Sequence, residues 1–250
     1  MAKAPEFPPL IEGHRVKAGQ DPFRVAGREA LKDRAGAGDL YWSEDQDRLA
    51  MALVLEPEVA PERCNDMLFV TMVAFGDCVG ALAPPEVGVF FRWPQTILVN
   101  GAAVGTARLR IAPSRTETGA PDWLVVGLDA AIRYPKHVTD PGLYPDITTL
   151  WEEGCHGLTR TELLESYSRH LKTWLFLWES DGVRPVRENW LGRAEKLGET
   201  IRIFYEGEEL QGTFLGLDED GNMLLKRGAE TAVLVLGHAL DRGAFDLAVT

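Results

Sequence analysis

A strong helix pattern followed at once by several strand patterns constrains the fold of this chain most. Apolar residues recur at helical spacing over 66–82, and Pro84 and Pro85 end that pattern. Short aromatic or β-branched runs then follow one another at 87–93, 96–99, 104–111 and 123–128. Asn100-Gly101 separates two of these runs and is a strong signal for a tight hairpin turn. A helix packed on hairpin-linked strands predicts an α+β domain.

Further elements are predicted on both sides of this region. Asp21 and Pro22 suit the start of a short helix over 21–31, and the continuous apolar run 49–55 is typical of a strand buried on both faces. A second long helix is predicted over 159–178, where Thr159 and Glu162 form a capping box.

The pattern changes near residue 186. Four short strands separated by turn residues are expected at 201–205, 210–217, 223–226 and 231–236. Strands so short and so closely spaced predict a small β-barrel. We therefore expect two domains, 1–185 and 186–250.

Composition excludes several classes of partner. A net charge of −12 repels phosphate backbones, which argues against nucleic acid. The sequence shows neither an apolar run of about 20 residues for a membrane span nor an N-terminal signal peptide. Its three cysteines are an odd number at no metal spacing, so a reduced, cytoplasmic location is expected.

Three short motifs favour ordinary structure over chemistry. Gly36-Ala-Gly38 begins like a dinucleotide fingerprint, but Tyr41 stands where the third glycine belongs. The acidic run 218–222 lacks the glutamate of a calcium loop and predicts a hairpin turn. The Glu, Cys and His residues of 152–156 fit no zinc spacing, so no metal site is predicted.

One segment carries a resemblance to a known family. Arg92-Trp-Pro-Gln95 and the following Ile97-Leu-Val-Asn-Gly101 resemble the Lys-Trp-Pro-Asn-Asp segment of biotin–protein ligases. Other pieces follow in that family's order: the loop Arg34-Ala-Gly-Ala-Gly38, the strand Leu124–Asp129 and the barrel segment 212–225. From about residue 20 the chain thus resembles the biotin/lipoate protein ligase family. The resemblance implies a class II synthetase-like mixed sheet flanked by helices, followed by an SH3-like barrel.

The resemblance also implies a reaction and its partners. The family joins biotin or lipoate to ATP, with magnesium, and then passes the acyl group to a lysine of a carrier protein. The family often dimerises through its sheet, so a homodimer is one possibility for this chain. The sequence shows no N-terminal helix-turn-helix, so a repressor role is not expected. Because both reactants of the first step are anionic, the site needs cations and hydrogen-bond donors.

This sequence departs from the family where those groups belong. Ala103 replaces the usual lysine, Ala131 the usual asparagine, and Asp39 follows the glycine loop. Losing one such donor typically costs about 100- to 1,000-fold in rate. The candidate catalytic residues that could supply positive charge in place of the missing groups are Arg34, Arg92, Arg108 and Arg110. The alternation of Arg108 and Arg110 along one strand places both on the same face, which either lines a pocket or faces solvent. The ligand-binding residues that the resemblance implies are Gly36, Gly38, Trp42, Trp93, Pro94, Gln95, Gly105 and Gly127.

Three hypotheses for function follow. An enzyme with a rebuilt site requires Arg108 or Arg110 to face the Gly36–Gly38 loop across a cavity. A non-catalytic protein would bind the acyl group or its adenylate on the same scaffold. A protein-interaction module without a small ligand is favoured if Tyr41, Trp42 and Trp93 fill the pocket.

Overall fold

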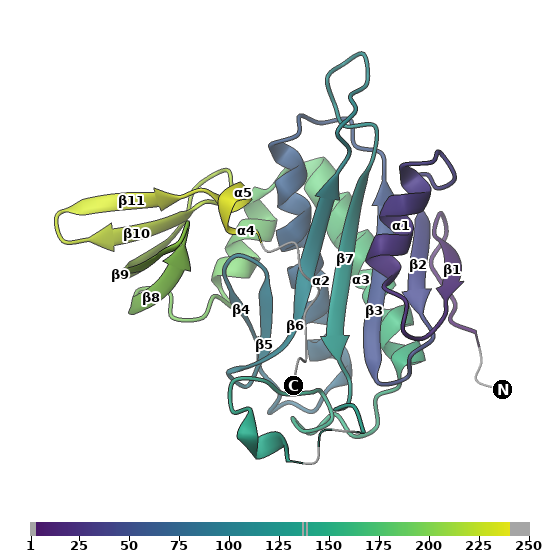
Figure 1. The fold of residues 1–250 in the computed structure, drawn as a ribbon, viewed down its shortest axis with the longest axis horizontal. Helices are drawn as coiled ribbons and strands as arrows, with labels where there is room; N and C mark the ends of the chain where they lie inside the picture. The colour runs from purple at the N-terminus through teal and green to yellow at the C-terminus, as the bar shows by residue number, and fades with distance from the viewer. Residues whose placement is uncertain (1–3, 137, 139, 241–250) are drawn as a thin grey trace.

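The computed structural model describes residues 4–136, 138 and 140–240. Its described residues form a seven-stranded mixed sheet, in the order β1-β2-β3-β7-β6-β5-β4, and a four-stranded antiparallel sheet beside it (Figure 1). The strands of the large sheet are β1 (Glu12–Val16), β2 (Asp39–Ser43), β3 (Arg48–Leu55), β4 (Val89–Arg92), β5 (Thr96–Val99), β6 (Ala102–Ile111) and β7 (Leu124–Ala131). β1 and β2 run parallel, whereas the other neighbours run antiparallel.

Helices cover the two faces of the large sheet unequally. The long helices α2 (Asp66–Leu82) and α3 (Arg160–Asp181) lie on one face, and the short α1 (Pro22–Ala30) lies on the other (Figure 1). Both predicted caps are confirmed: the Asp21 carboxylate accepts the Phe23 N–H, and Thr159 with Glu162 forms the capping box. Smaller helical elements are α4 (Arg184–Leu191), α5 (Leu236–Ala239) and the 3-10 turns Arg63–Asn65 and Pro141–Leu143.

Helix α2 is the centre of the main hydrophobic core. Thirteen of its residues are buried, because it lies between the sheet and helices α3 and α4. Contrary to the sequence expectation, the stretch Arg63–Leu82 is long and apolar enough to cross a membrane by length and composition alone. However, 72% of its apolar window is buried within the fold, as in the core helix of a soluble protein.

The second sheet follows α4 in the order β11-β10-β9-β8. Its strands are β8 (Thr200–Tyr205), β9 (Glu208–Leu217), β10 (Met223–Arg227) and β11 (Glu230–Leu234). The expected α+β fold with a small β domain is confirmed, and the Asp218 carboxylate accepts the backbone N–H of Asp220 and Asn222, as the predicted turn requires. The proposed division between residues 185 and 186 falls within α4, whose Val186 and Trp190 are buried in the main core.

Among the elements that escaped the sequence patterns are β1, β2 and α4. The polar composition of β1 hides it, since Glu12 and Arg15 are exposed at the edge of the sheet. Strand β2 is only five residues long and follows the glycine loop directly. The loop Arg34–Gly38 therefore lies between α1 and β2.

A candidate ligand cavity beside helix α1

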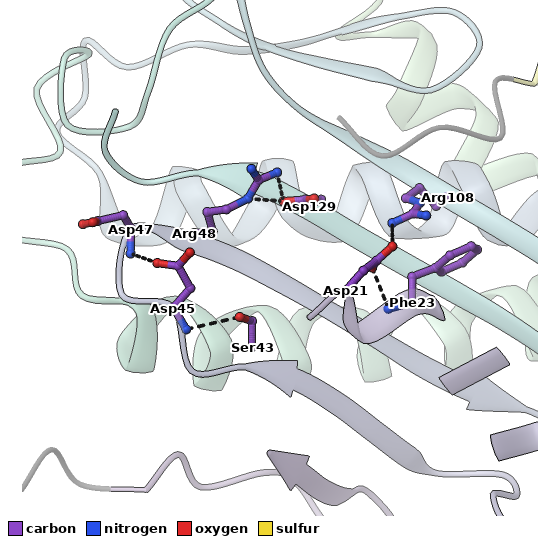
Figure 2. A network of polar contacts seen from close by, with 8 residues as sticks. All are labelled: Asp21, Phe23, Ser43, Asp45, Asp47, Arg48, Arg108 and Asp129. Atoms are coloured by element: carbon purple, nitrogen blue, oxygen red, sulfur yellow. Dashed lines mark hydrogen bonds and ion pairs between the residues drawn. The ribbon is translucent and has the colours of Figure 1, made fainter. Parts of the chain in front are cut away.

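An ion pair joins the start of α1 to strand β6. The Arg108 guanidinium donates to Asp21 Oδ2 at 2.9 Å, while Asp21 Oδ1 accepts the Phe23 N–H at 2.9 Å (Figure 2). The Arg108 side chain is only 5% exposed. One carboxylate thus both caps a helix and neutralises a buried cation, so the position of α1 is tied to the charge on β6.

A second ion pair lies farther along the same face of the sheet. Arg48, at the start of β3, contacts Asp129 of β7 at 2.7 Å, and Asp129 is 7% exposed (Figure 2). Burial raises the pKa of the Asp129 carboxyl above its usual range, although Arg48 opposes this effect. Figure 2 shows both pairs over the same region of the sheet, with Asp129 on β7 and Arg108 on the neighbouring β6.

Aromatic packing covers the sheet between these groups. The Phe23 ring lies 2.5 Å from the point where a Cβ would stand on Gly127, and the Arg108 guanidinium lies 4.2 Å from the ring centroid. The absence of a side chain at Gly127 is what lets Phe23 approach the sheet. Phe23 thus covers the Arg108 guanidinium, whose side chain is almost fully buried.

A cavity of about 550 Å³ opens along β6 beside this cover. Its apolar wall includes Phe23, Leu109, Ile111, Pro113 and Leu240, and its polar wall Arg24, Asn65, Gln95, Arg108 and Arg110. Asp21 is shared by Arg108 and Arg24, the latter at 3.5 Å. Among the described residues, no carboxylate lies within ion-pair distance of Arg110, whose guanidinium lies 5.6 Å from the Trp123 ring centroid. The cavity therefore combines apolar surface with surplus positive charge, which suits an amphipathic anion.

The structure brings together three of the residues singled out from the sequence. Arg108, Arg110 and Gln95 line this cavity, and the two arginines share the α1 face of β6 as predicted. Their environments differ, since Arg110 is exposed whereas Arg108 is buried. Placement in solvent, the alternative for both, is thus wrong for Arg108.

The glycine loop does not reach this cavity. Gly36 and Gly38 are absent from its lining, and the Gly36 N–H donates to the Asp39 carboxylate at 2.8 Å. The Ala37 N–H donates to the Glu56 carboxylate at 3.3 Å, and Arg34 is exposed. Carboxylates thus occupy the backbone donors with which such a loop would hold a phosphate. The hypothesis of a rebuilt enzyme site requires Arg108 or Arg110 to face this loop across a cavity. The cavity that both arginines line does not include the loop.

The remaining predicted residues support the fold. Trp93 is 4% exposed, and its indole N–H donates to Gly221 O at 3.0 Å, which ties β4 and β5 to the second sheet. Trp42 is buried beneath the Arg160 guanidinium, which lies 5.0 Å from its ring centroid. Arg92 is paired with Glu195 at 2.6 Å, outside the cavity.

Two more predicted positions, Pro94 and Gly105, also lie outside the cavity lining. Pro94 is half-buried between Trp93 and Gln95. A Cβ on Gly105 would stand 2.4 Å from the Asp129 carbonyl oxygen, so this glycine permits close contact between β6 and β7. Among the described residues no group of three or more His, Cys, Asp or Glu side chains is arranged to hold a metal ion.

Sequence patterns did not identify Asp21, Phe23, Arg24, Arg48 or Asp129 as parts of this region. A usable signal existed for Asp129, because β7 reads LVVGLDAA and a single charge inside a buried apolar strand requires a partner. Its partner Arg48 lies 81 residues away in the sequence. Only the fold shows that Arg48 is the cation that pairs with Asp129.

Comparison with known proteins agrees with this architecture. The sequence model of the biotin/lipoate A/B protein ligase family matches residues 7–192, and that of the biotin protein ligase C terminal domain matches residues 196–237. A biotin protein ligase-like protein of unknown function from Silicibacter sp. TM1040 is 37% identical, with a TM-score of 0.82 over 93% of this chain and 97% of that one.

Two further relatives are biotin ligases by name. A biotin–[acetyl-CoA-carboxylase] ligase of Paracoccus denitrificans is 26% identical over 93% of this chain and 92% of its own length. The biotin protein ligase of Aquifex aeolicus in complex with biotin and ATP shares the fold, with 16% identity and a TM-score of 0.71 over 90% of this chain and 96% of that one. Because the family match spans most of the described residues, the chain belongs to the biotin/lipoate A/B protein ligase family.

Proposed function

We propose that this protein binds a small carboxylic acid of the biotin or lipoate type in the cavity beside α1, without joining it to ATP. The observation that carries the proposal is the surplus of guanidinium groups over carboxylates in a cavity with an apolar wall. Three arginines face it, and Asp21 is the carboxylate that two of them share. An acyl chain would contact Phe23 and Leu109, and its carboxylate would pair with Arg110.

Binding without ligation agrees with the rest of the site. The loop that would cradle phosphates has its N–H donors on Asp39 and Glu56. Ala103 and Ala131 stand where the family resemblance implies a lysine and an asparagine. Those residues do not fit ATP with magnesium, so no adenylation step is assigned to this chain. Transfer of an acyl group to a carrier lysine would then need an acyl donor activated elsewhere.

Calorimetric titration and thermal shift with biotin, lipoate and octanoate test the proposal. Each acid is compared with its uncharged amide, which has the same shape but cannot form an ion pair with Arg110. Acid at 100 times its dissociation constant should stabilise the protein by about 2.7 kcal/mol, and the amide should bind at least about tenfold more weakly. Equal affinity for acid and amide, or no binding of any acid, would contradict it.

Arg110→Gln and Arg28→Gln form a matched pair of variants. Arg110 lines the cavity, whereas Arg28 is an exposed arginine of α1 paired with Glu29 outside it. Arg110→Gln should weaken acid binding about tenfold and Arg28→Gln should leave it unchanged. A separate assay with ATP, magnesium, biotin and a purified carrier domain should show no acylation, and acylation above background would overturn the non-ligating part of the proposal.

A protein-interaction module is the second candidate, and one observation favours it. Tyr41, Trp42 and Trp93 are each at most 8% exposed and pack in the hydrophobic cores. None of the three lines the cavity beside α1, although Trp93 borders a smaller cavity of about 270 Å³ between β4 and the second sheet. Failure of all three acids to bind would shift the assignment to this function.

A further inference from the structure

A second cavity, of about 270 Å³, lies between the large sheet and the second sheet. Its walls come from the end of β4, the linker after α4 and the strands β8, β9 and β10 (Figure 1). No described residue lines both this cavity and the one beside α1. An apolar cavity of about 150 Å³ holds one benzene ring, so this cavity has room for a ring and a charged group.

The floor of this cavity is apolar and fixed in position. Trp93, Phe214 and Met223 line it, and each is at most 4% exposed. The Trp93 indole N–H donates to Gly221 O at 3.0 Å, which fixes the orientation of its ring. The Phe214 N–H donates to Glu199 O at 2.9 Å, so the backbone beneath the floor is held as well. Two aromatic rings and a thioether are favourable contacts for a further aromatic ring.

One wall of the cavity is the free edge of β8. The second sheet has the order β11-β10-β9-β8, so no described strand lies beyond β8 on this side. Ile201, Arg202 and Ile203 are consecutive, and all three line the cavity. Because side chains alternate between the two faces of a strand, consecutive residues share a cavity along the edge of that strand. The backbone groups that do not bond to β9 are thus turned toward the cavity and available to a ligand.

The polar part of the lining carries surplus positive charge. Arg92 donates to Glu195 twice, at 2.6 and 3.0 Å, so these two charges cancel. The same hydrogen bonds hold the pKa of the Glu195 carboxyl below its ordinary value. Lys196 and Arg202 are exposed, and no described carboxylate lies within ion-pair distance of either. Two cations without partners, in a chain whose net charge is −12, suit a ligand with two negative charges.

The backbone at Lys196 is a further sign of a built site. Its φ is +57°, in the left-handed region that favours glycine. The turn that holds it is fixed, because the Glu199 N–H donates to Lys196 O at 3.0 Å and the Gly198 N–H donates to Phe214 O at 2.8 Å. Glycine would adopt this conformation with less strain, yet the position carries a lysine that lines the cavity.

We propose that this cavity binds a small aromatic dianion, of which an aryl phosphate fits its size and charge best. The ring contacts Trp93 and Met223, and the phosphate pairs with Lys196 and Arg202. The ligand thereby joins the end of β4 to the free edge of β8. Because the two cavities share no described lining residue, this site is independent of the proposed function.

Calorimetric titration with phenyl phosphate at pH 8 tests the proposal. At that pH the ester carries two charges, since its second pKa is about 6. Phenyl phosphate should bind at least about tenfold more tightly than phenol, which lacks the charge, and than inorganic phosphate, which lacks the ring. Absence of binding would overturn the proposal. Equal affinity for phenyl phosphate and inorganic phosphate would also overturn it, because the protein would then attract any dianion through surface charge.

Lys196→Gln and Lys226→Gln form a matched pair of variants. Both lysines are exposed, but Lys226 of β10 lies outside the cavity lining. Lys196→Gln should weaken phenyl phosphate binding about tenfold, and Lys226→Gln should leave it unchanged. Lys196→Gly should weaken binding as much without lowering the Tm, because glycine relieves the strained backbone. Equal losses of affinity at positions 196 and 226 would contradict a specific site.

The position of the ligand can be measured separately. Phenyl phosphate should shift the NMR signals of the Trp93 indole N–H and of the Ile201 and Ile203 amides, while the Trp174 indole N–H on α3 should stay unchanged. Binding without a shift at Trp93 would refute the placement. Arg110→Gln alters only the cavity beside α1 and should leave phenyl phosphate affinity unchanged, whereas a loss of about tenfold would move this ligand to that cavity.

Discussion

Arg108 on β6 and Asp21 at the start of α1 form an ion pair of 2.9 Å in which the two partners are unequally buried. The arginine side chain is 5% exposed and the aspartate side chain 24% exposed. Water can therefore replace Arg108 as a partner of Asp21, but it can hardly replace Asp21 as a partner of Arg108.

Removal of the two partners should accordingly have unequal effects on stability. Asp21→Ala leaves a buried guanidinium unpaired and removes a helix cap, which should cost about 3 kcal/mol or more. Arg108→Met leaves an accessible carboxylate and should cost about 1 kcal/mol. Urea unfolding at pH 7 measures both, and a cost of Asp21→Ala no larger than that of Arg108→Met would contradict the role given to the cap and the buried charge.

A side chain on Gly127 should collide with Phe23. The Cβ of Gly127→Ala would lie 2.5 Å from the ring, so the variant should lose about 1–3 kcal/mol through overpacking. In the double variant Phe23→Leu/Gly127→Ala the penalty of the alanine should fall below about 1 kcal/mol, because leucine leaves the space that the ring occupied. Additive losses in this cycle would show that the two positions do not touch.

The two glycines of the loop before β2 should respond differently to alanine. Gly38 has a φ of +96°, and its Cβ would stand 2.2 Å from the Leu10 carbonyl oxygen, so Gly38→Ala should cost about 2 kcal/mol or more. Gly36 meets only the end of the Glu56 side chain, so Gly36→Ala should change stability by less than about 1 kcal/mol. The Gly36→Ala variant should bind the acid as tightly as the parent protein. Loss of acid binding in this variant would show that the loop is part of the ligand site.

Asp66 should make the stability of the protein depend on pH. Burial raises the pKa of its carboxyl to about 6, although it accepts a hydrogen bond from the Trp178 indole and pairs with Arg63. Between about pH 4 and pH 6 the folded protein thus binds a proton that the unfolded chain releases. The contribution of Asp66 to stability is therefore greatest below pH 4 and is lost as the pH rises to about 6.

Asp66→Asn should remove this pH dependence. The variant should gain up to about 3 kcal/mol relative to the parent protein at pH 7, and gain nothing at pH 4. Urea unfolding from pH 4 to pH 8 measures the difference, with the exposed Asp181→Asn as the control. A gain that is equal at both ends of this range would contradict the assignment to Asp66.

The arrangement of local elements followed from the sequence wherever a local pattern decided it. The periodicity of 66–82, the Asn100-Gly101 turn and the capping box at Thr159 each depend on neighbours within a few residues, and the structure has α2, the β5–β6 hairpin and α3 at these places. Strand β1 escaped because its pairing with β2 depends on residues outside its own sequence. The family resemblance, carried by short segments in a fixed order, identified the fold as a whole.

Only the tertiary structure decided the composition of the candidate site. The alternation of Arg108 and Arg110 placed both on one face, but their burial depends on α1, which the Asp21 carboxylate holds over β6. The glycine loop resembled a phosphate loop in sequence, yet its donors bond to Asp39 and to the more distant Glu56. Local sequence determines which helices and strands form, because their patterns involve residues a few positions apart. Packing determines which side chains share a cavity, because the paired charges are 81 and 87 positions apart in the sequence.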